Sequence, residues 1–379
     1  MKIAVIGGGI GGLTAAGLLY QTGHDVQVYE KRNDLNQVGA GIGIGSNVLK
    51  ALKPYKMTYA IEQEGQALNK IEIRTNLDSF LNTLKMNQDE EQNITIHRSV
   101  LHEILKTHVP PERINLDYKL KEFKQTPDNI RLYFENGQEA EADLVIAADG
   151  LNSNIRKQIQ PKSEPKYAGY TCFRGVVNEN LNIDRTTALE YWGHKGRFGI
   201  VPLKDDELYW FCTMNAKEND LQFKSFEKPH LQAYFNQYPD EVRNVLDAQE
   251  ELGILHHDMY DLTPLKSFIS GRVVLLGDAA HATTPNMGQG AGQAIEDAVT
   301  LTNLLKEKDV DAALKRYNKL RVKHTRKVIK KSRKIGKAGQ ASNTMKIKMR
   351  NKMLKSMSSK SLSKKVKFLQ KAKLKYKMN

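Results

Sequence analysis

Cysteine is scarce in this chain of 379 residues, which contains only Cys172 and Cys212, far apart in the sequence. Two isolated cysteines exclude a disulfide scaffold and a cysteine-rich metal site, and they fit a reducing cytoplasm. Histidine does not take their place, because His256 and His257 are adjacent and lack partners at a metal-binding spacing. We therefore expect no metal site and a cytoplasmic location.

Long apolar runs are also missing. The longest, LVIAA at 144–148 and VVLL at 273–276, have the length of buried strands and are too short to cross a membrane. The apolar start of the chain contains too many glycines for a signal peptide. With 40% hydrophobic and 27% charged residues, the composition is that of a folded globular protein, and the length allows two domains.

Acidic residues are absent from the last part of the chain. Residues 312–379 hold 25 Lys and Arg and no Asp or Glu. The residues before them hold 33 basic and 43 acidic side chains, a net charge of −10, although the whole chain carries +15. An acidic body therefore carries a strongly basic tail.

The clearest motif is the glycine-rich turn VIGGGIGGLT at 5–14. Residues 2–6 predict a buried strand and residues 13–20 an apolar helix, so the glycines lie in a strand-to-helix turn. There Gly7 suits a tight turn, Gly9 the close approach of a pyrophosphate and Gly12 close helix packing. The helix N-terminus offers free amides to the anion.

A second strand, DVQVYE at 25–30, ends at Glu30, where a carboxylate can bind ribose hydroxyls. Gly11 and Lys31, which lie beside these positions, complete the candidates for this part of a dinucleotide site. These residues alone leave open whether the dinucleotide is NAD or FAD.

Two further predicted strands end in short acidic motifs. LVIAADG at 144–150 ends in Asp149-Gly150, and RVVLLGDAAH at 272–281 contains Gly277-Asp278. With these motifs the sequence resembles the single-component FAD-dependent aromatic hydroxylases, the group of para-hydroxybenzoate, salicylate and urate hydroxylases. Their GxGxxG, DG and GD fingerprints all occur here in the same order, and the resemblance covers roughly residues 1–335.

The resemblance implies an α/β fold in three parts. A discontinuous Rossmann-like FAD-binding domain would comprise 1–69, 97–165 and 268–335, and an inserted, mainly antiparallel β-sheet substrate domain 70–96 and 166–267. Residues 336–379 would form a basic C-terminal helical tail.

The resemblance also implies cofactor contacts. Asp278 would bind ribityl or ribose hydroxyls of FAD, and Arg98 would reach its phosphates. Asp149 or Asp278 could instead cap the next helix, and Arg98 could be an ordinary exposed side chain. Pro285 would shape the loop beside the flavin. The opening of the next helix, whose amides would face the pyrimidine side of the flavin, contains Gly288, Gln289 and Gly290.

The middle of the chain predicts an antiparallel sheet, which in related hydroxylases roofs the flavin over the substrate. Arg197 and Tyr209 look similar to the pair that contacts substrate in the bacterial urate hydroxylase branch. The arginine would bind an anionic or phenolate-like group and the tyrosine would orient substrate or relay a proton. Alternatively, Arg197 forms a surface salt bridge. The strand-like runs are 170–177, 188–193, 197–203 and 207–214.

The chemistry implied by the resemblance is a monooxygenation. NADH or NADPH would reduce FAD, O2 would form a flavin C4a-hydroperoxide, and one oxygen atom would pass to an aromatic or heteroaromatic small molecule. Only one complete GxGxxG occurs, and Trp192 and Trp210 lack the pairing typical of flavin halogenases. Two alternatives remain open: a flavin-dependent reductase or oxidase of a lipophilic isoprenoid or quinone-like substrate, and a membrane-associated flavin-binding protein.

The basic tail has its own pattern. A helix is expected from about 310 to 342, followed by methionines at every fourth position among lysines. We favour docking of this methionine stripe onto the acidic body over binding to an anionic membrane surface. Nucleic-acid binding is the weakest alternative because aromatic residues are sparse. The stripe consists of Met345, Met349, Met353 and Met357.

Overall fold

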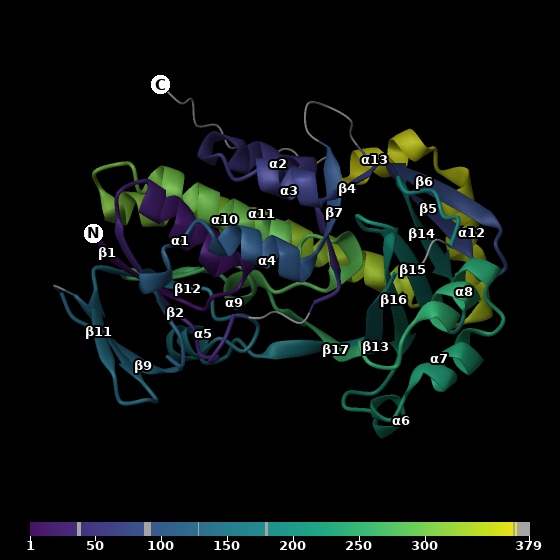
Figure 1. The fold of residues 1–379 in the computed structure, drawn as a ribbon, viewed down its shortest axis with the longest axis horizontal. Helices are drawn as coiled ribbons and strands as arrows, with labels where there is room; N and C mark the ends of the chain where they lie inside the picture. The colour runs from purple at the N-terminus through teal and green to yellow at the C-terminus, as the bar shows by residue number, and fades with distance from the viewer. Residues whose placement is uncertain (36–38, 87–91, 128, 179–180, 367, 370–379) are drawn as a thin grey trace.

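The computed structural model describes residues 1–35, 39–86, 92–127, 129–178, 181–366 and 368–369. One half of the molecule is built on a six-stranded sheet in the order β18-β19-β12-β1-β2-β8, in which only β18 runs antiparallel to its neighbour (Figure 1). The predicted strands at the three fingerprints are confirmed. The strands are β1 (Lys2–Ile6), β2 (Asp25–Tyr29), β8 (Ile114–Asn115), β12 (Leu144–Ala147), β18 (Ile269–Ser270) and β19 (Val273–Leu275).

Helices and two small sheets surround this sheet. Helix α1 (Ile10–Gln21) follows the glycine turn and packs against α10 (Gly290–Leu304), which begins at the predicted glycines. Both helices are apolar and almost wholly buried, as expected for helices in the interior of an α/β layer. The small antiparallel sheets are β3 (Gly41–Ile44), β7 (Asn93–His97) and β4 (Gln66–Leu68), and β11 (Glu139–Ala142), β10 (Ile130–Phe134) and β9 (Leu120–Gln125).

Shorter elements join these parts. They are the α-helices α2 (Ser46–Leu52), α3 (Tyr59–Glu64), α4 (Arg98–Lys106), α5 (Asn154–Ile159) and α9 (Asp278–His281), and the 3-10 helices η1 (Lys53–Tyr55), η2 (Pro111–Arg113) and η3 (Pro285–Met287).

The other half contains a seven-stranded sheet in the order β17-β13-β16-β15-β14-β5-β6. The predicted antiparallel strands are confirmed as β13 to β16, and the structure adds β17 at one edge and β5 and β6 at the other. The division of the chain into domains stays a prediction. The strands are β5 (Lys70–Thr75), β6 (Phe80–Lys85), β13 (Pro165–Asn178), β14 (Thr187–Trp192), β15 (Arg197–Pro202), β16 (Glu207–Asn215) and β17 (Leu255–Leu262).

The two faces of the seven-stranded sheet have different neighbours. Phe198 and Trp210 are buried on one face against α7 and α8, where Leu231 and Val245 pack on them. Because side chains alternate along a strand, the residues beside them face the other half of the molecule. The covering helices are α6 (Leu221–Lys224), α7 (Lys228–Phe235) and α8 (Asp240–Ala248).

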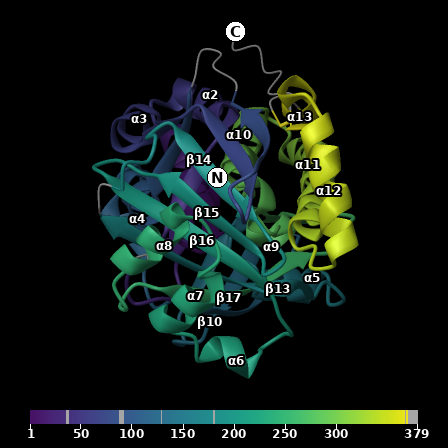
Figure 2. The ribbon, with the colours of Figure 1, turned by 90° about the vertical axis from the view of Figure 1, so that its right-hand side faces the viewer.

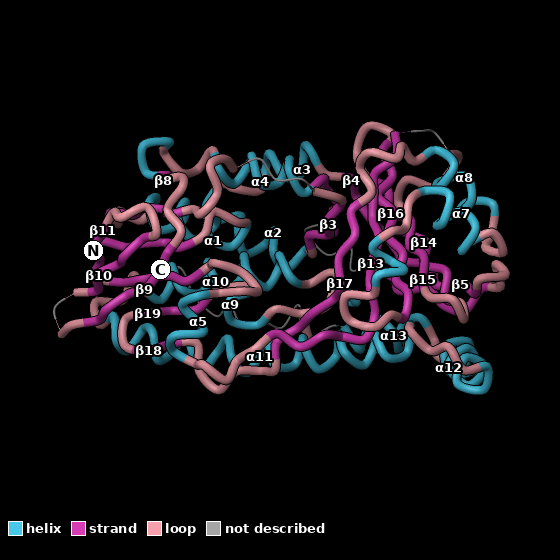
Figure 3. The backbone as a smooth tube through the Cα atoms, turned by 90° about the horizontal axis from the view of Figure 1, so that it is seen from below, coloured by secondary structure: helices cyan, strands magenta, loops and turns pink. Residues whose placement is uncertain are grey.

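A single long helix runs beside both halves (Figure 3). Helix α11 (Val310–Gly339) has 30 residues and is therefore about 45 Å long. The helix expected from about 310 to 342 is confirmed, and it ends at Gly339. A Cβ atom at Gly339 would lie 2.6 Å from Cδ of Arg197, so the helix end meets the seven-stranded sheet without a side chain between them.

Two short helices of the tail, α12 (Thr344–Ser356) and α13 (Ser359–Val366), lie at one side of the molecule (Figure 2) and pack against β6. Leu354 packs with Ile73, and the Arg350 guanidinium lies 5.4 Å from the centre of the Trp192 ring. Burial lowers the pKa of Arg350 to about 10, and the nearby Arg197 contributes to this shift. These contacts decide which face of α12 meets the body.

The expected docking of the methionine stripe is wrong for the greater part of the stripe. Met345, Met349 and Met353 are 72%, 67% and 49% exposed, and only Met357 packs on the body. The face that carries Arg350 and Leu354 meets the body instead, and the stripe turns outward. In the described residues no helix is long and apolar enough to cross a membrane.

Candidate active site

A cavity of about 1600 Å³ lies between the two halves of the molecule. One end is bounded by the loops that follow β1, β2, β12 and β19, where the carboxyl ends of parallel strands meet. The other end is bounded by the open face of the seven-stranded sheet. The predicted site residues that line the cavity are Gly9, Gly11, Arg98, Arg197, Tyr209, Gly277, Asp278, Pro285, Gly288, Gln289 and Gly290.

The remaining predicted residues lie beside the cavity and do not line it. Lys31 points to solvent, and the neighbouring Arg32, which the pattern did not single out, lines the cavity in its place. The residues beside the lining are Gly7, Gly12, Glu30, Lys31 and Asp149.

The three fingerprint glycines have separate structural reasons. Gly7 has φ +107°, and a Cβ atom on Gly12 would lie 1.9 Å from the carbonyl oxygen of Gly7. Larger residues at either position would therefore strain or displace the turn. A Cβ atom on Gly9 would meet nothing within 4 Å, because this position opens onto the cavity. Such an open glycine beside a helix N-terminus fits the pyrophosphate of a dinucleotide.

Glu30 holds the glycine turn in place. Its carboxylate accepts hydrogen bonds from the backbone N–H of Gly8 at 2.6 Å and of Arg32 at 3.1 Å. A carboxylate has about four acceptor sites, so two remain for hydroxyl groups of a ligand. His102 contacts the same turn, with its Nε2 2.7 Å from the carbonyl oxygen of Gly8.

The two acidic strand ends differ. Asp149 accepts a hydrogen bond at 2.9 Å from the backbone N–H of Asn154 at the start of α5. This contact corresponds to the alternative in which Asp149 caps the next helix. Its other oxygen is buried without a hydrogen-bond partner in the described part of the chain, and burial raises the pKa of the carboxyl. Asp278 faces the cavity instead. Burial raises the pKa of Asp278, while His281 and Arg98 act in the opposite direction.

An ionic network beneath Asp278 was not predicted. Asp297 on α10 accepts from the backbone N–H of Gly277 at 2.9 Å and contacts His281 at 2.5 Å and Arg321 of α11. Burial alone would raise the pKa of Asp297, but the charges of His281 and Arg321 lower it to about 2. Arg321 also pairs with Glu296 at 3.0 Å. Two adjacent acidic residues inside an apolar helix were the available signal, because buried charges require partners.

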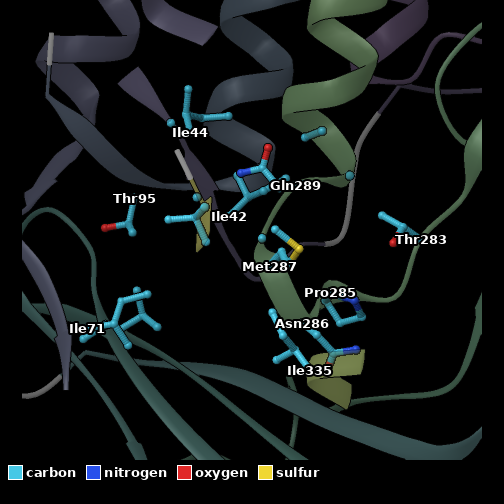
Figure 4. A pocket seen from close by; sticks show the side chains of 18 of the residues that line it. Ile42, Ile44, Ile71, Thr95, Thr283, Pro285, Asn286, Met287, Gln289 and Ile335 are labelled. Carbon is cyan, nitrogen blue, oxygen red and sulfur yellow. The ribbon is translucent and has the colours of Figure 1, made fainter. Parts of the chain in front are cut away.

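At the sheet end of the cavity, Arg197 is only 2% exposed, so the alternative of a surface salt bridge is wrong. Its guanidinium donates to the Oδ1 of Asn286 at 2.5 Å and lies 3.9 Å from the carboxylate of Glu190. Asn286 in turn donates to the hydroxyl of Tyr170 at 3.0 Å. The side chain of Asn286 points into the cavity from the loop that also carries Pro285 and Met287 (Figure 4).

Tyr209 lies farther along the same face of the sheet. Its ring packs so closely on the backbone of Gly41 that a Cβ atom there would lie 2.5 Å from the tyrosine Cβ. Burial raises the pKa of Tyr209, so its hydroxyl stays protonated at neutral pH. Arg197 is opposite Thr213, four residues from Tyr209, so the two predicted residues start about 13 Å apart along the strands. Phe211 lies between them on the same face, so a ring that contacts both would lie over Phe211.

These observations fit a flavin dinucleotide. The open glycine, the cavity-facing Asp278 and the nearby Arg98 supply a backbone cradle, a hydroxyl acceptor and a cation for phosphate. No cluster of three or more His, Cys, Asp or Glu side chains that could hold a metal ion occurs in the described ranges.

Comparisons with known proteins point in the same direction. The family model described as "FAD binding domain" matches residues 1–332. The aurachin C monooxygenase/isomerase of Stigmatella aurantiaca is 34% identical over 364 residues, 95% of each chain. The 3-amino-4-hydroxybenzoate 2-monooxygenase of Streptomyces cremeus is 32% identical over 346 residues, 88% of this chain and 86% of that one. The structure of Klebsiella pneumoniae HpxO with FAD and uric acid has a TM-score of 0.91 at 25% identity, covering 98% and 97%.

Proposed function

The chain belongs to the family of the FAD binding domain and is an FAD-dependent monooxygenase, and from this premise we propose that Arg197 and Tyr209 hold its aromatic substrate. FAD is the cofactor and NADH or NADPH the reductant. The observation that carries the proposal is that one cavity is lined both by the strand-end loops and by the face of the seven-stranded sheet. A ring bound against that face lies in the same enclosed space as the cofactor loops.

When bound, FAD supplies hydride acceptance and the activation of O2 for transfer of one oxygen atom. The chain's own residues position and shield. The Arg197 guanidinium is held by Asn286 and Glu190 and offers its charge to a phenolate or carbonyl oxygen. The protonated Tyr209 hydroxyl can donate to a second polar group of the ring.

The N-terminus of α10 contributes electrostatically. It begins at Gly290, after the left-handed Gly288, and opens onto the cavity. The free amides of a helix N-terminus carry a partial positive charge, which stabilises negative charge that develops nearby. The Asp297 network fixes α10 relative to Gly277 and so keeps these amides in place.

The defining experiment uses the full-length protein loaded with FAD. NADH or NADPH is supplied as the reductant, and a panel of phenols, purines and quinone precursors is tested as substrates. We expect one class of aromatic compound to stimulate NAD(P)H oxidation and O2 uptake and to gain an oxygen atom from isotopically labelled O2. Oxidation of NAD(P)H with a reduced product and no incorporated label would identify a reductase instead.

We further propose that α12 lies on an anionic membrane surface. Met345 and Met349 are exposed side by side along one face, with Lys346, Lys348 and Lys352 around them. Apolar side chains flanked by lysines suit the interface of a bilayer that contains anionic lipid. Flotation with phosphatidylserine vesicles should recover the protein, and the double variant Met345→Ser/Met349→Ser should float less. Equal flotation of both proteins would refute the role of α12.

A further inference from the structure

The cavity extends beyond the region that Arg197 and Tyr209 flank. The cavity of about 1600 Å³ includes the space at the strand-end loops that FAD occupies when bound. Away from those loops its lining continues onto β5, β6, the end of α11 and the tail helices α12 and α13. We call this part the tail arm of the cavity.

The sheet provides one wall of the tail arm. Ile71 on β5 pairs with Leu84 on β6 and with Ala188 on β14, and all three line the cavity. Leu84 is four strands from Tyr209 on β16, a distance of about 19 Å across the sheet. Ala188 on β14 and Val201 on β15 line the cavity between the two regions.

The helices provide the opposite wall. Ile335 of α11, Leu354 of α12 and Leu362 of α13 line the cavity and belong to one apolar cluster with Ile73. Figure 4 shows Ile71 and Ile335 facing the same space as Ile42 of β3 and Met287 of η3, so the arm belongs to the same cavity. Asn82 fixes this wall, because its amide donates to the carbonyl oxygens of Leu354 and Met357.

Positive charge dominates the tail arm. Among the described residues of β5, β6 and α11–α13 that line the cavity there is no Asp or Glu, and the lining carboxylate of Glu190 on the neighbouring β14 lies 3.9 Å from the Arg197 guanidinium. The lysines of the tail-arm elements, such as Lys85, Lys334 and Lys360, are exposed at the outer rim. An apolar passage with a basic rim does not suit a small polar ring, which would leave it unfilled.

We propose that the tail arm binds an aliphatic chain, and that the substrate is an aromatic or heteroaromatic ring carrying a long alkyl or alkenyl substituent. This inference rests on the proposed function, because it assigns the ring to the region flanked by Arg197 and Tyr209. The aliphatic chain of the substrate then runs across Ala188 toward Ile71 and Leu84 and is covered by α12 and α13.

The test is a chain-length series of 4-alkylphenols, from methyl to dodecyl, titrated calorimetrically into the FAD-loaded protein. Each buried methylene should lower Kd about fourfold. The heat-capacity change of binding should become more negative with each methylene, because apolar surface is buried. A Kd that does not change with chain length would overturn the proposal.

Two variants test where the alkyl chain of the ligand binds. Leu84→Trp fills the tail arm and should flatten the dependence of Kd on chain length. Thr83→Trp, on the opposite face of the same strand, should leave that dependence as it is. If Kd depends on alkyl-chain length equally in both variants, the alkyl chain binds elsewhere and the proposed role of the tail arm is refuted. If Leu84→Trp does not fold, Ile71→Phe on the paired strand replaces it.

The two proposals fail separately. If short phenols stimulate oxygen transfer and chain length has no effect on Kd, the proposed function holds and the tail arm does not. If Kd falls with chain length and no aromatic compound is oxygenated, the tail arm holds and the monooxygenase chemistry proposed for this ring does not.

Discussion

The side-chain amide of Asn82 on β6 donates hydrogen bonds to the carbonyl oxygens of Leu354, at 2.7 Å, and Met357, at 2.8 Å. Asn82 is 4% exposed, so both bonds are largely shielded from water. The last carbonyl groups of a helix lack intrahelical donors, and here the Leu354 carbonyl also accepts from the backbone N–H of Met357. One side chain thus joins the seven-stranded sheet to the basic tail.

Removing that side chain should loosen the tail. Asn82→Ala leaves the carbonyl oxygen of Met357 without its donor, at a cost of about 1–3 kcal/mol, while the carbonyl of Leu354 keeps the backbone N–H of Met357. Limited trypsin digestion should therefore cut α12 faster, because its lysines are released from the body. Asn136→Ala, which removes a hydrogen bond to Asp117 in an exposed turn, is the matched control and should leave cleavage unchanged. Equal cleavage of all three proteins would contradict this role.

The glycines of the first turn should respond differently to alanine. Gly9→Ala adds a methyl group that meets no protein atom, so the free energy of unfolding of the apoprotein should stay the same. The methyl group enters the cavity, and FAD affinity should fall about tenfold or more. Gly12→Ala collides with the Gly7 carbonyl and should destabilise the fold by about 1–3 kcal/mol. Urea unfolding and FAD content separate the two effects. Full FAD binding by Gly9→Ala would argue against the cradle.

Arg197 should control ligand binding. Arg197→Ala removes a charged hydrogen-bond donor worth about 1.5–3 kcal/mol, so phenolate ligands should bind roughly 10 to 100 times more weakly. A smaller fraction of the oxidised NAD(P)H should lead to transfer of an oxygen atom to the substrate. Arg131→Ala breaks an exposed ion pair with Glu141 and serves as the control. Unchanged affinity and coupling in Arg197→Ala would remove this residue from the substrate site.

His324 on α11 should make stability depend on pH. Burial, aided by Arg321, lowers its pKa from 6.5 to about 4 in the folded chain. The unfolded chain then binds the proton more readily, so stability is lost as the pH falls from above 6.5 toward 4. Between pH 7.5 and pH 5 the loss from this residue is about 2 kcal/mol.

The variant His324→Gln isolates that contribution. Urea unfolding at both pH values should show a smaller decrease for the variant than for the native chain, because the carboxylates titrate alike in both. An identical decrease would show that His324 titrates normally in the folded state.

The strands and turns at the cofactor end of the cavity could be predicted from local patterns, while the contacts of their residues with FAD stay a prediction. Gly9, Gly277 and Asp278 all follow apolar strands, and parallel strands bring their carboxyl ends together without further information. The glycine turn depends on sterics within a few residues, so its sequence specifies its shape. One position was missed by a single residue, since Arg32 lines the cavity and Lys31 does not.

Contacts between distant segments were beyond the sequence pattern. Asp297 meets Arg321 24 positions later, and Asn82 meets Leu354 272 positions later. The direction of the methionine stripe was wrong for the same reason. Helical periodicity identifies two faces of α12, but the packing of Arg350 on Trp192 selects the inner one.

The hydrogen bond between Asn82 and Leu354 also bears on the order in which the parts of the site are synthesised. A ribosome adds about 5–20 residues per second, so roughly 14 to 54 s separate the synthesis of these two residues. By the time Leu354 is added, the glycine turn, both acidic strand ends and α10 have all been synthesised. The nascent chain can therefore form its cofactor loops before α12, which packs on β6, has been translated.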